Sequence, residues 1–188
     1  AKAAVEKALD VAKDKGVNYF MISFTDLFGG QRAKLVPTQA IGDMQIDGAG
    51  FAGFATWLDM TPAHPDMLAV PDPASVIQLP WKPEVAWVAA DCIMEGTPVE
   101  QAPRTVLKRQ IAKAEKSGLH VKTGVEAEFF LLSADGSQIS DAHDTAEKPC
   151  YDQGALMRRY DVIAEICDCM LDMGWGPYQN DHEDANGQ

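Results

Sequence analysis

Clusters of apolar residues, separated by turn-forming residues, predict the first elements of the chain. Residues 19–25 (YFMISFT) are rich in aromatic and β-branched side chains, and residues 31–36 follow after a DLFGG turn, so we expect a β-hairpin. Glycine and proline interrupt residues 38–75 so often that we expect a loop-rich stretch there. Residues 76–79 and 85–90 are two further candidate strands.

Three segments have the apolar spacing of helices. Residues 2–15 carry one apolar stripe, and residues 105–117 lie between Pro103 and Gly118, residue types that commonly flank a helix. Asp152 can cap a third, long helix. Its expected apolar face comprises Leu156, Tyr160, Ile163, Cys167, Met170 and Gly174.

Residues 121–132 and 178–183 predict two more strands, one on each side of the third helix. The chain therefore mixes strands and helices, and we expect an α+β fold with two domains, 1–102 and 103–188. The second domain opens a strand–helix–strand unit and then stops, so we expect it to be incomplete.

The chain is acidic, because 16 Lys and Arg residues are outnumbered by 28 Asp and Glu residues, giving a formal net charge of −12. Nucleic acid and anionic membrane surfaces would repel it, so we expect neither as a partner. No apolar run approaches the about 20 residues that span a bilayer, and the N-terminus lacks the apolar core of a signal peptide. Four cysteines without C-x-x-C spacing are typical of reduced thiols, so we expect a soluble, cytoplasmic protein.

Residues 48–53 (GAGFAG) satisfy the G-x-G-x-x-G pattern of dinucleotide sites. Such a site needs a buried strand before the pattern and a helix after it, whose N-terminal amides hold the pyrophosphate. Residues 42–47 make a poor buried strand, and Pro62 leaves little room for a helix. We therefore expect a flexible loop, and a dinucleotide-dependent oxidoreductase is disfavoured.

Glu126 and Glu128 alternate with apolar residues in TGVEAEFFLL, so a strand would place both carboxylates on one face. Two like charges side by side are unfavourable unless they are exposed, protonated or bridged by a cation. A solvated strand face is one interpretation. A site for Mg²⁺ or Mn²⁺ is the other, because these ions prefer carboxylate oxygens.

Residues 180–188 (NDHEDANGQ) form a second acidic segment. The spacing of its acids and the position of its glycine exclude an EF-hand loop. A polar turn is the simplest interpretation, and a lone His182 is more often a surface or hydrogen-bonded histidine than a metal ligand. If the two acidic segments end neighbouring strands, they can share a metal site.

Several motifs, in chain order, resemble those of the glutamine synthetase family. The most specific are residues 124–130 (GVEAEFF), similar to G-x-E-x-E-F-F, and residues 182–188 (HEDANGQ), similar to H-E-V-A-x-G-Q. The other matches are FTDL at 24–27 with Gly30 and Arg32, DGAGFAGF at 47–54, DM at 66–67 with PD at 71–72, and PR at 103–104 through KR at 108–109. The NDHEDANGQ segment is similar to the subgroup called type III or GlnT, which includes γ-glutamylmethylamide synthetases.

This resemblance implies an N-terminal β-grasp domain followed by the opening of a catalytic domain, in a family whose members are more than twice as long. It implies an ATP-dependent ligase, in which ATP phosphorylates the γ-carboxylate of glutamate and an amine then displaces phosphate. It also implies a homo-oligomer, a dodecamer in this family, with active sites between subunits.

The resemblance assigns roles by motif position. Glu128 and Glu183 would bind one Mg²⁺ or Mn²⁺ ion, and Glu126 a second; Glu183 would also lie close to substrate. Asp47 of a neighbouring subunit would take a proton from the incoming ammonium as the catalytic base. Tyr151 is expected to line the amine site.

Two departures from the family pattern bear on function. Ala49 and Gly50 replace a pair of serines beside Asp47, which removes a hydroxyl and adds room, so we expect methylamine to be favoured over ammonia. The chain also ends before the family's next metal glutamate and its ATP-binding histidine and arginines, so we expect these 188 residues alone to be inactive. A glutamine synthetase that uses ammonia is one alternative, and a regulatory, non-catalytic family member is another.

Overall fold

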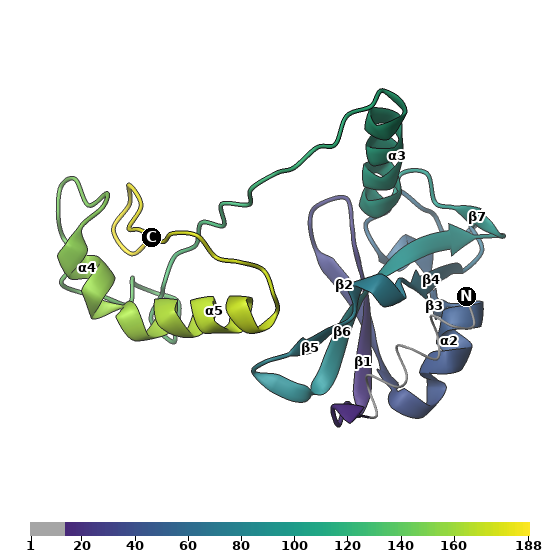
Figure 1. Ribbon diagram of the computed structural model, residues 1–188, viewed down its shortest axis with the longest axis horizontal. Coiled ribbons are helices and arrows are strands. Elements are labelled where there is room, and N and C mark those ends of the chain that lie inside the picture. The colour runs from purple at the N-terminus through teal and green to yellow at the C-terminus, as the bar shows by residue number, and fades with distance from the viewer. Residues whose placement is uncertain (1–13) are drawn as a thin grey trace. The chain divides into compact units, whose positions relative to one another are not determined.

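The structure, a computed structural model, describes residues 14–188, which form two compact units that divide between Val121 and Lys122. Figure 1 shows a first unit rich in strands and a second unit with two helices and long irregular segments. The expected α+β fold is confirmed. The helix predicted over residues 2–15 lies almost entirely outside the described residues, and the domain boundary after residue 102 stays a prediction.

The first unit is built on a mixed sheet whose central strand is β6, as Figure 1 shows. The strands are β1 (Tyr19–Thr25), β2 (Gln31–Pro37), β3 (Ala49–Phe51), β4 (Met67–Pro71), β5 (Ile77–Leu79), β6 (Lys82–Met94) and β7 (Thr97–Pro98). Their order is β2-β1-β6-β4-β3, with β5 and β7 also paired to β6. β1 runs parallel to β6, and the other pairs are antiparallel.

The predicted hairpin of β1 and β2 is confirmed, with Tyr19 opposite Pro37 and Thr25 opposite Gln31. Phe20, Ile22 and Phe24 alternate along β1 and are all buried, which places them in the core of the unit. The strands predicted at 76–79 and 85–90 correspond to β5 and to part of the longer β6.

Residues 38–75 contain more regular structure than their glycines and prolines predict. They include the helix α2 (Ile41–Asp47), the strands β3 and β4, and three 3₁₀ turns. The turns are η1 (Thr38–Ala40), η2 (Gly53–Ala55) and η3 (Pro73–Ser75). The flexible loop predicted over residues 48–53 is wrong, because β3 lies within these residues and pairs with β4, which in turn pairs with β6.

α3 (Pro103–Lys116) confirms the helix predicted there, and it groups with the first unit. None of its side chains is buried, so charged contacts hold it to the sheet. Arg104 donates hydrogen bonds to Asp91 Oδ1 (3.0 Å) and to Asp72, and Lys108 donates to Asp91 Oδ2 (2.6 Å).

The second unit contains α4 (Gln153–Arg158) and α5 (Tyr160–Asp172), where the sequence predicts one long helix. Asp152 caps α4 as predicted, because its Oδ1 accepts a hydrogen bond from a backbone N–H of the first turn at 2.8 Å. The helix breaks at Arg159, where φ is −117° and ψ is 13°. Gly174 lies beyond the end of α5, so it does not belong to the helix face.

The strands predicted over residues 121–132 and 178–183 do not form in the described structure. Residues 121–131 have no regular structure, and Leu132 makes a single antiparallel bridge with Ile139. A strand forms where a partner completes its hydrogen bonds, and no part of residues 14–188 pairs with 121–131 as a strand. Most of their apolar side chains stay exposed, with Val125 at 89%.

Within residues 14–188, no helix is both long and apolar enough to cross a membrane.

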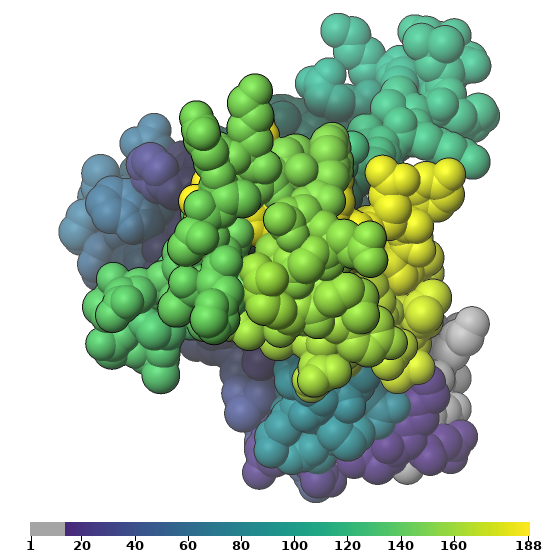
Figure 2. All heavy atoms as spheres, turned by 90° about the vertical axis from the view of Figure 1, so that its left-hand side faces the viewer, coloured from purple at the N-terminus to yellow at the C-terminus, as the bar shows by residue number. Residues whose placement is uncertain are grey.

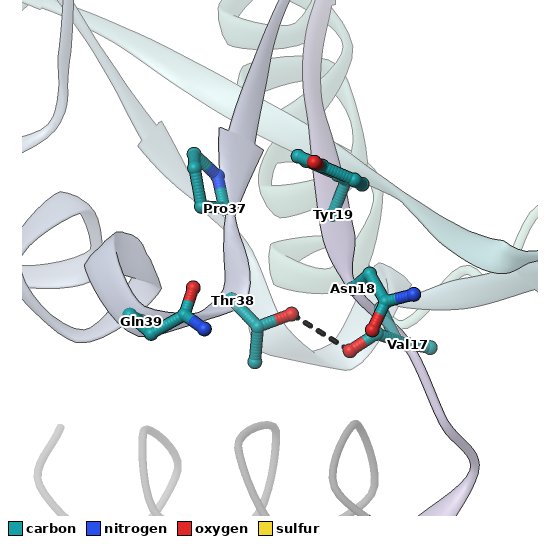
Figure 3. A pocket seen from close by; sticks show the side chains of 6 residues that line it. All are labelled: Val17, Asn18, Tyr19, Pro37, Thr38 and Gln39. Atoms are coloured by element: carbon teal, nitrogen blue, oxygen red, sulfur yellow. Dashed lines mark hydrogen bonds between the residues drawn. The ribbon is translucent and has the colours of Figure 1, made fainter.

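A hollow of about 310 Å³ lies at the ends of β1 and β2 (Figure 3) and is lined by Val17, Asn18, Tyr19, Pro37, Thr38 and Gln39. The hydroxyl of Thr38 donates to the Val17 carbonyl at 2.8 Å, and none of the residues assigned a chemical role lies there.

Candidate functional site

The acidic segment at residues 182–188 is a defined turn held by two other segments of the second unit. Leu131 N–H donates to Gly187 O and Tyr151 N–H donates to His182 O, both at 2.9 Å. Gly187 has a φ of 84°, and a Cβ there would lie 2.5 Å from a neighbouring isoleucine side chain, so only glycine fits. Figure 2 shows this C-terminal segment in yellow beside the green segments of the same unit.

His182 and Asp144 form a buried pair at the base of this turn. His182 Nε2 lies 2.7 Å from Asp144 Oδ2, and His182 Nδ1 lies 2.7 Å from the Glu183 carbonyl oxygen. Both ring nitrogens face acceptors, which both receive a hydrogen bond only from the doubly protonated ring. His182 is therefore an ion-pair partner with no free nitrogen for a metal.

Burial alone would raise the pKa of Asp144, but hydrogen bonds from His182, the Gly187 N–H and Asn186 outweigh it and hold this pKa below its ordinary value. Burial alone would lower the pKa of His182, but its bonds to Asp144 and to the Glu183 carbonyl outweigh it and raise that pKa. The lowered pKa of Asp144 and the raised pKa of His182 both favour an ion pair between the Asp144 carboxylate and the protonated His182 ring.

Gln188 joins two of the predicted metal ligands. Its side-chain Nε2 donates to Glu128 Oε2 at 2.8 Å, and its backbone carbonyl accepts the Glu183 N–H at 3.2 Å. The structure therefore brings the Glu128 segment and the Glu183 turn to one place. Glu126 is exposed, and because its segment is not a strand, the predicted shared face with Glu128 is not formed.

Within residues 14–188, no group of three or more His, Cys, Asp or Glu side chains lies close enough to hold a metal ion. Glu128 and Glu183 both contact Gln188, and they fit Mg²⁺, which commonly takes one or two carboxylates and fills its remaining positions with water and substrate phosphates. Glu128 and Glu183 would supply those two carboxylates.

Tyr151 lies next to the acidic turn and has an unusual backbone. Its φ is 65°, a left-handed conformation that bulky residues seldom adopt, and its side chain is 75% exposed. The Cys150 thiol, followed by the charges of Asp181 and Glu183, raises the pKa of Tyr151, which further favours the neutral phenol. An exposed ring beside carboxylates is a favourable surface for a small organic cation.

Asp47 lies in the first unit as the last residue of α2, and it is exposed. The chain turns sharply after it, because Gly48 has a φ of 79° and ψ of 161°. Lys34 then holds β3: its Nζ donates to the Gly50 carbonyl and lies 5.0 Å from the centre of the Phe51 ring. Asp47 thus lies exposed at a sharp corner of the chain.

The G-x-G-x-x-G match at residues 48–53 lacks the setting of a dinucleotide site. A helix, α2, precedes it where a strand is required, and β3 lies inside the pattern. Only the three-residue turn η2 follows where a long helix would be needed. The backbone around residues 48–53 therefore does not support a dinucleotide site.

Sequence reasoning did not identify Asp144. The segment 141–144 (DAHD) contains two aspartates with no periodicity or motif to separate them. Only the fold distinguishes them, because Asp144 contacts the turn 182–188 and Asp141 contacts Arg158.

Comparison with known proteins gives a consistent result. The glutamine synthetase catalytic domain family matches residues 100–188. A protein of Rhizobium leguminosarum bv. phaseoli named glutamine synthetase is 78% identical over 177 residues, covering 94% of this chain and 41% of its own length. A glutamate–methylamine ligase of Methyloversatilis universalis is 38% identical over 186 residues, covering 97% of this chain and 42% of its own.

A comparison with solved structures also finds similar proteins. A structure described as a GmaS/ADP complex superposes with a TM-score of 0.92 at 64% sequence identity, covering 96% of this chain and 42% of that one. The chain therefore spans about two fifths of the length of the relatives that it matches.

Proposed function

Because the chain belongs to the glutamine synthetase family, we propose that it forms part of an ATP-dependent ligase that joins an amine to the γ-carboxylate of L-glutamate. The observation that carries this proposal is the pair of contacts at Gln188, whose side chain donates to the Glu128 carboxylate and whose carbonyl accepts the Glu183 N–H. The resemblance assigns the carboxylates of these two residues to a divalent ion. Glu126 would serve a second ion.

The residues of the chain have distinct roles in this proposal. Bound Mg²⁺ or Mn²⁺ would neutralise phosphate charge during transfer from ATP to glutamate. Glu128 and Glu183 would hold the ion, and Glu183 would also lie near the glutamate γ-carboxylate. Asp47, presented at the corner after α2, would take a proton from the ammonium form of the amine before it attacks γ-glutamyl phosphate.

We propose methylamine as the favoured amine. A Cβ at Gly50 would meet no heavy atom within 4 Å, so the space beside the Asp47 corner is open. The exposed Tyr151 ring beside Glu183 suits a methylated cation. The relative from Methyloversatilis and the GmaS likeness support the same choice. A homododecameric, cytoplasmic enzyme is part of this proposal and rests on the family resemblance.

Glutamine synthesis from ammonia is the second candidate, and the 78% identity to a protein named glutamine synthetase favours it. Phosphate release by the complete gene product, with glutamate, ATP and Mg²⁺ and either methylamine or ammonium, separates the two. We expect a higher kcat/KM with methylamine. A higher value with ammonium would assign glutamine synthesis, and no release with either amine would favour a non-catalytic family member.

The Gly50→Ser variant tests the structural basis of this preference. Restoring a hydroxyl should shift the ratio of kcat/KM values toward ammonium by about 10-fold, since one methyl-sized difference in a pocket contributes about 1–3 kcal/mol. Ala63→Ser is a suitable control, because Ala63 is exposed in a turn before β4 and its replacement also adds a hydroxyl. An unchanged ratio in Gly50→Ser would remove this position from the account of specificity.

A further inference from the structure

We propose that Asp144 is a positioning residue that fixes the turn 182–188 so that Glu183 and Glu128 can bind a divalent ion. This inference rests on the proposed function, because it gives Asp144 a role in the same metal site. Asp144 itself would not touch the ion.

Asp144 holds the turn on both sides of Glu183. Before Glu183, His182 Nε2 donates to Asp144 Oδ2 at 2.7 Å. After it, Asn186 Nδ2 donates to Asp144 Oδ1 at 3.1 Å, and the Gly187 N–H donates to Asp144 Oδ2. A flexible turn anchored on only one side could still swing its carboxylate, whereas this one is anchored on both.

The same contacts extend to the second ligand. With Gly187 held by Asp144, the next residue, Gln188, is placed to accept the Glu183 N–H and to donate to Glu128 Oε2. The buried Asp144 carboxylate is therefore linked, through the turn, to the backbone of Glu183 and to the carboxylate of Glu128. In other metalloproteins, removing a group that orients metal ligands in this way commonly changes metal affinity about 10- to 100-fold.

Asp141 provides a matched comparison. It lies three residues earlier, is 6% exposed where Asp144 is 4% exposed, and also forms an ion pair, with Arg158 Nε at 2.7 Å. Its partner belongs to α4 and not to the turn 182–188. Both aspartates should support folding, but only Asp144 should affect the metal ligands.

The test measures Mn²⁺ binding by electron paramagnetic resonance of the complete gene product, together with the Mn²⁺ dependence of phosphate release. In Asp144→Asn, either orientation of the amide places its NH2 group against a donor that the carboxylate accepts, and the negative charge facing His182 is lost, so the anchor of the turn weakens. We expect the tightest Mn²⁺ site to weaken by about 10- to 100-fold. The Mn²⁺ concentration for half-maximal turnover should rise in parallel, with a smaller change in kcat at saturating Mn²⁺. Asp141→Asn should leave both Mn²⁺ values within about twofold of wild type, whatever its effect on thermal stability.

Each outcome bears on Asp144. The proposal would be overturned if Asp144→Asn bound Mn²⁺ as tightly as wild type. It would also be overturned if Asp141→Asn lost as much Mn²⁺ affinity as Asp144→Asn, or if wild type had no tight Mn²⁺ site. If Asp144→Asn does not fold, Asn186→Ala removes one of the three donors, and a shift of at least about threefold supports the proposal while no shift overturns it. Mn²⁺ binding that depends on Asp144 in a protein without glutamate-dependent phosphate release would refute the proposed function but not the role of Asp144.

Discussion

Among single residues, Gly48 is the one whose backbone most directly controls a candidate catalytic group. It turns the chain after Asp47 with a φ of 79°, and its Cα lies so close to β4 that a Cβ would sit 2.9 Å from Leu68 Cβ. Asp47 therefore keeps its place only if residue 48 has no side chain.

Replacing Gly48 with alanine should destabilise the first unit by about 1–3 kcal/mol, the usual cost of a non-glycine residue in this conformation. Urea unfolding of the complete gene product measures the change. Gly50→Ala is the control, because a Cβ there meets open space, and it should alter stability by no more than about 0.5 kcal/mol. Equal effects of the two variants would show that Gly48 is not constrained.

At this scale, the sequence alone identifies residues that belong to a motif. Glu126, Glu128 and Glu183 stand in recognisable patterns, whereas Asp144 acts through contacts with residues about 40 positions later in the chain. Neither periodicity nor charge pattern distinguishes it from Asp141. A contact between distant segments can be predicted only after the fold that brings them together.

Among the elements, the β1–β2 hairpin has the most strongly specified turn. The buried Asp26 accepts hydrogen bonds from the Phe28 and Gly30 N–H groups at 2.9 and 2.8 Å, and from Arg32 Nε at 2.8 Å. Burial would raise the pKa of Asp26, but the bonds from Phe28, Arg32 and Gly30 outweigh it, so this pKa lies below the ordinary value of 3.8. The ionised carboxylate therefore stabilises the hairpin.

Asp26→Asn should consequently be less stable than wild type at neutral pH. Because the folded-state pKa is depressed, this stabilisation is present above the unfolded pKa near 3.8 and is lost as the pH falls through the lower folded value. Urea unfolding of both proteins from about pH 7 to about pH 3 measures their free energies of unfolding. The difference between these two free energies should become smaller below about pH 4. A difference that stays constant over this range would contradict the account, and the exposed Asp66→Asn serves as the control.

Local sequence pattern predicts the elements whose structure depends little on contacts with distant parts of the chain. β1 and β2 are joined by a short turn, and α3 begins at Pro103 and ends shortly before Gly118. α2 and β4 lie among glycines and prolines, and pairing with distant strands or packing against them decides their structure. Residues 121–131 show the reverse case, because a strong strand pattern without a partner strand remains irregular.

For the whole molecule, the two units carry different parts of the proposed chemistry. The first unit presents Asp47, and the second unit holds Glu128 and Glu183 through the turn that Asp144 anchors. The family motifs predict this division of candidate residues from the sequence. The anchoring of the turn depends on the folded second unit, which the motifs do not describe.

The most direct test of the account is glutamate-dependent phosphate release by the complete gene product and its Glu128→Ala variant, with the exposed Glu147→Ala as the matched control. Losing an ion ligand removes several kcal/mol of charge stabilisation in phosphoryl transfer, so we expect Glu128→Ala to reduce turnover at least about 100-fold. Glu147→Ala should retain turnover, and all three proteins should elute at the same size. Turnover of Glu128→Ala close to wild type would contradict the assignment of Glu128 as a metal ligand, and with it the proposal of a metal-dependent ligase.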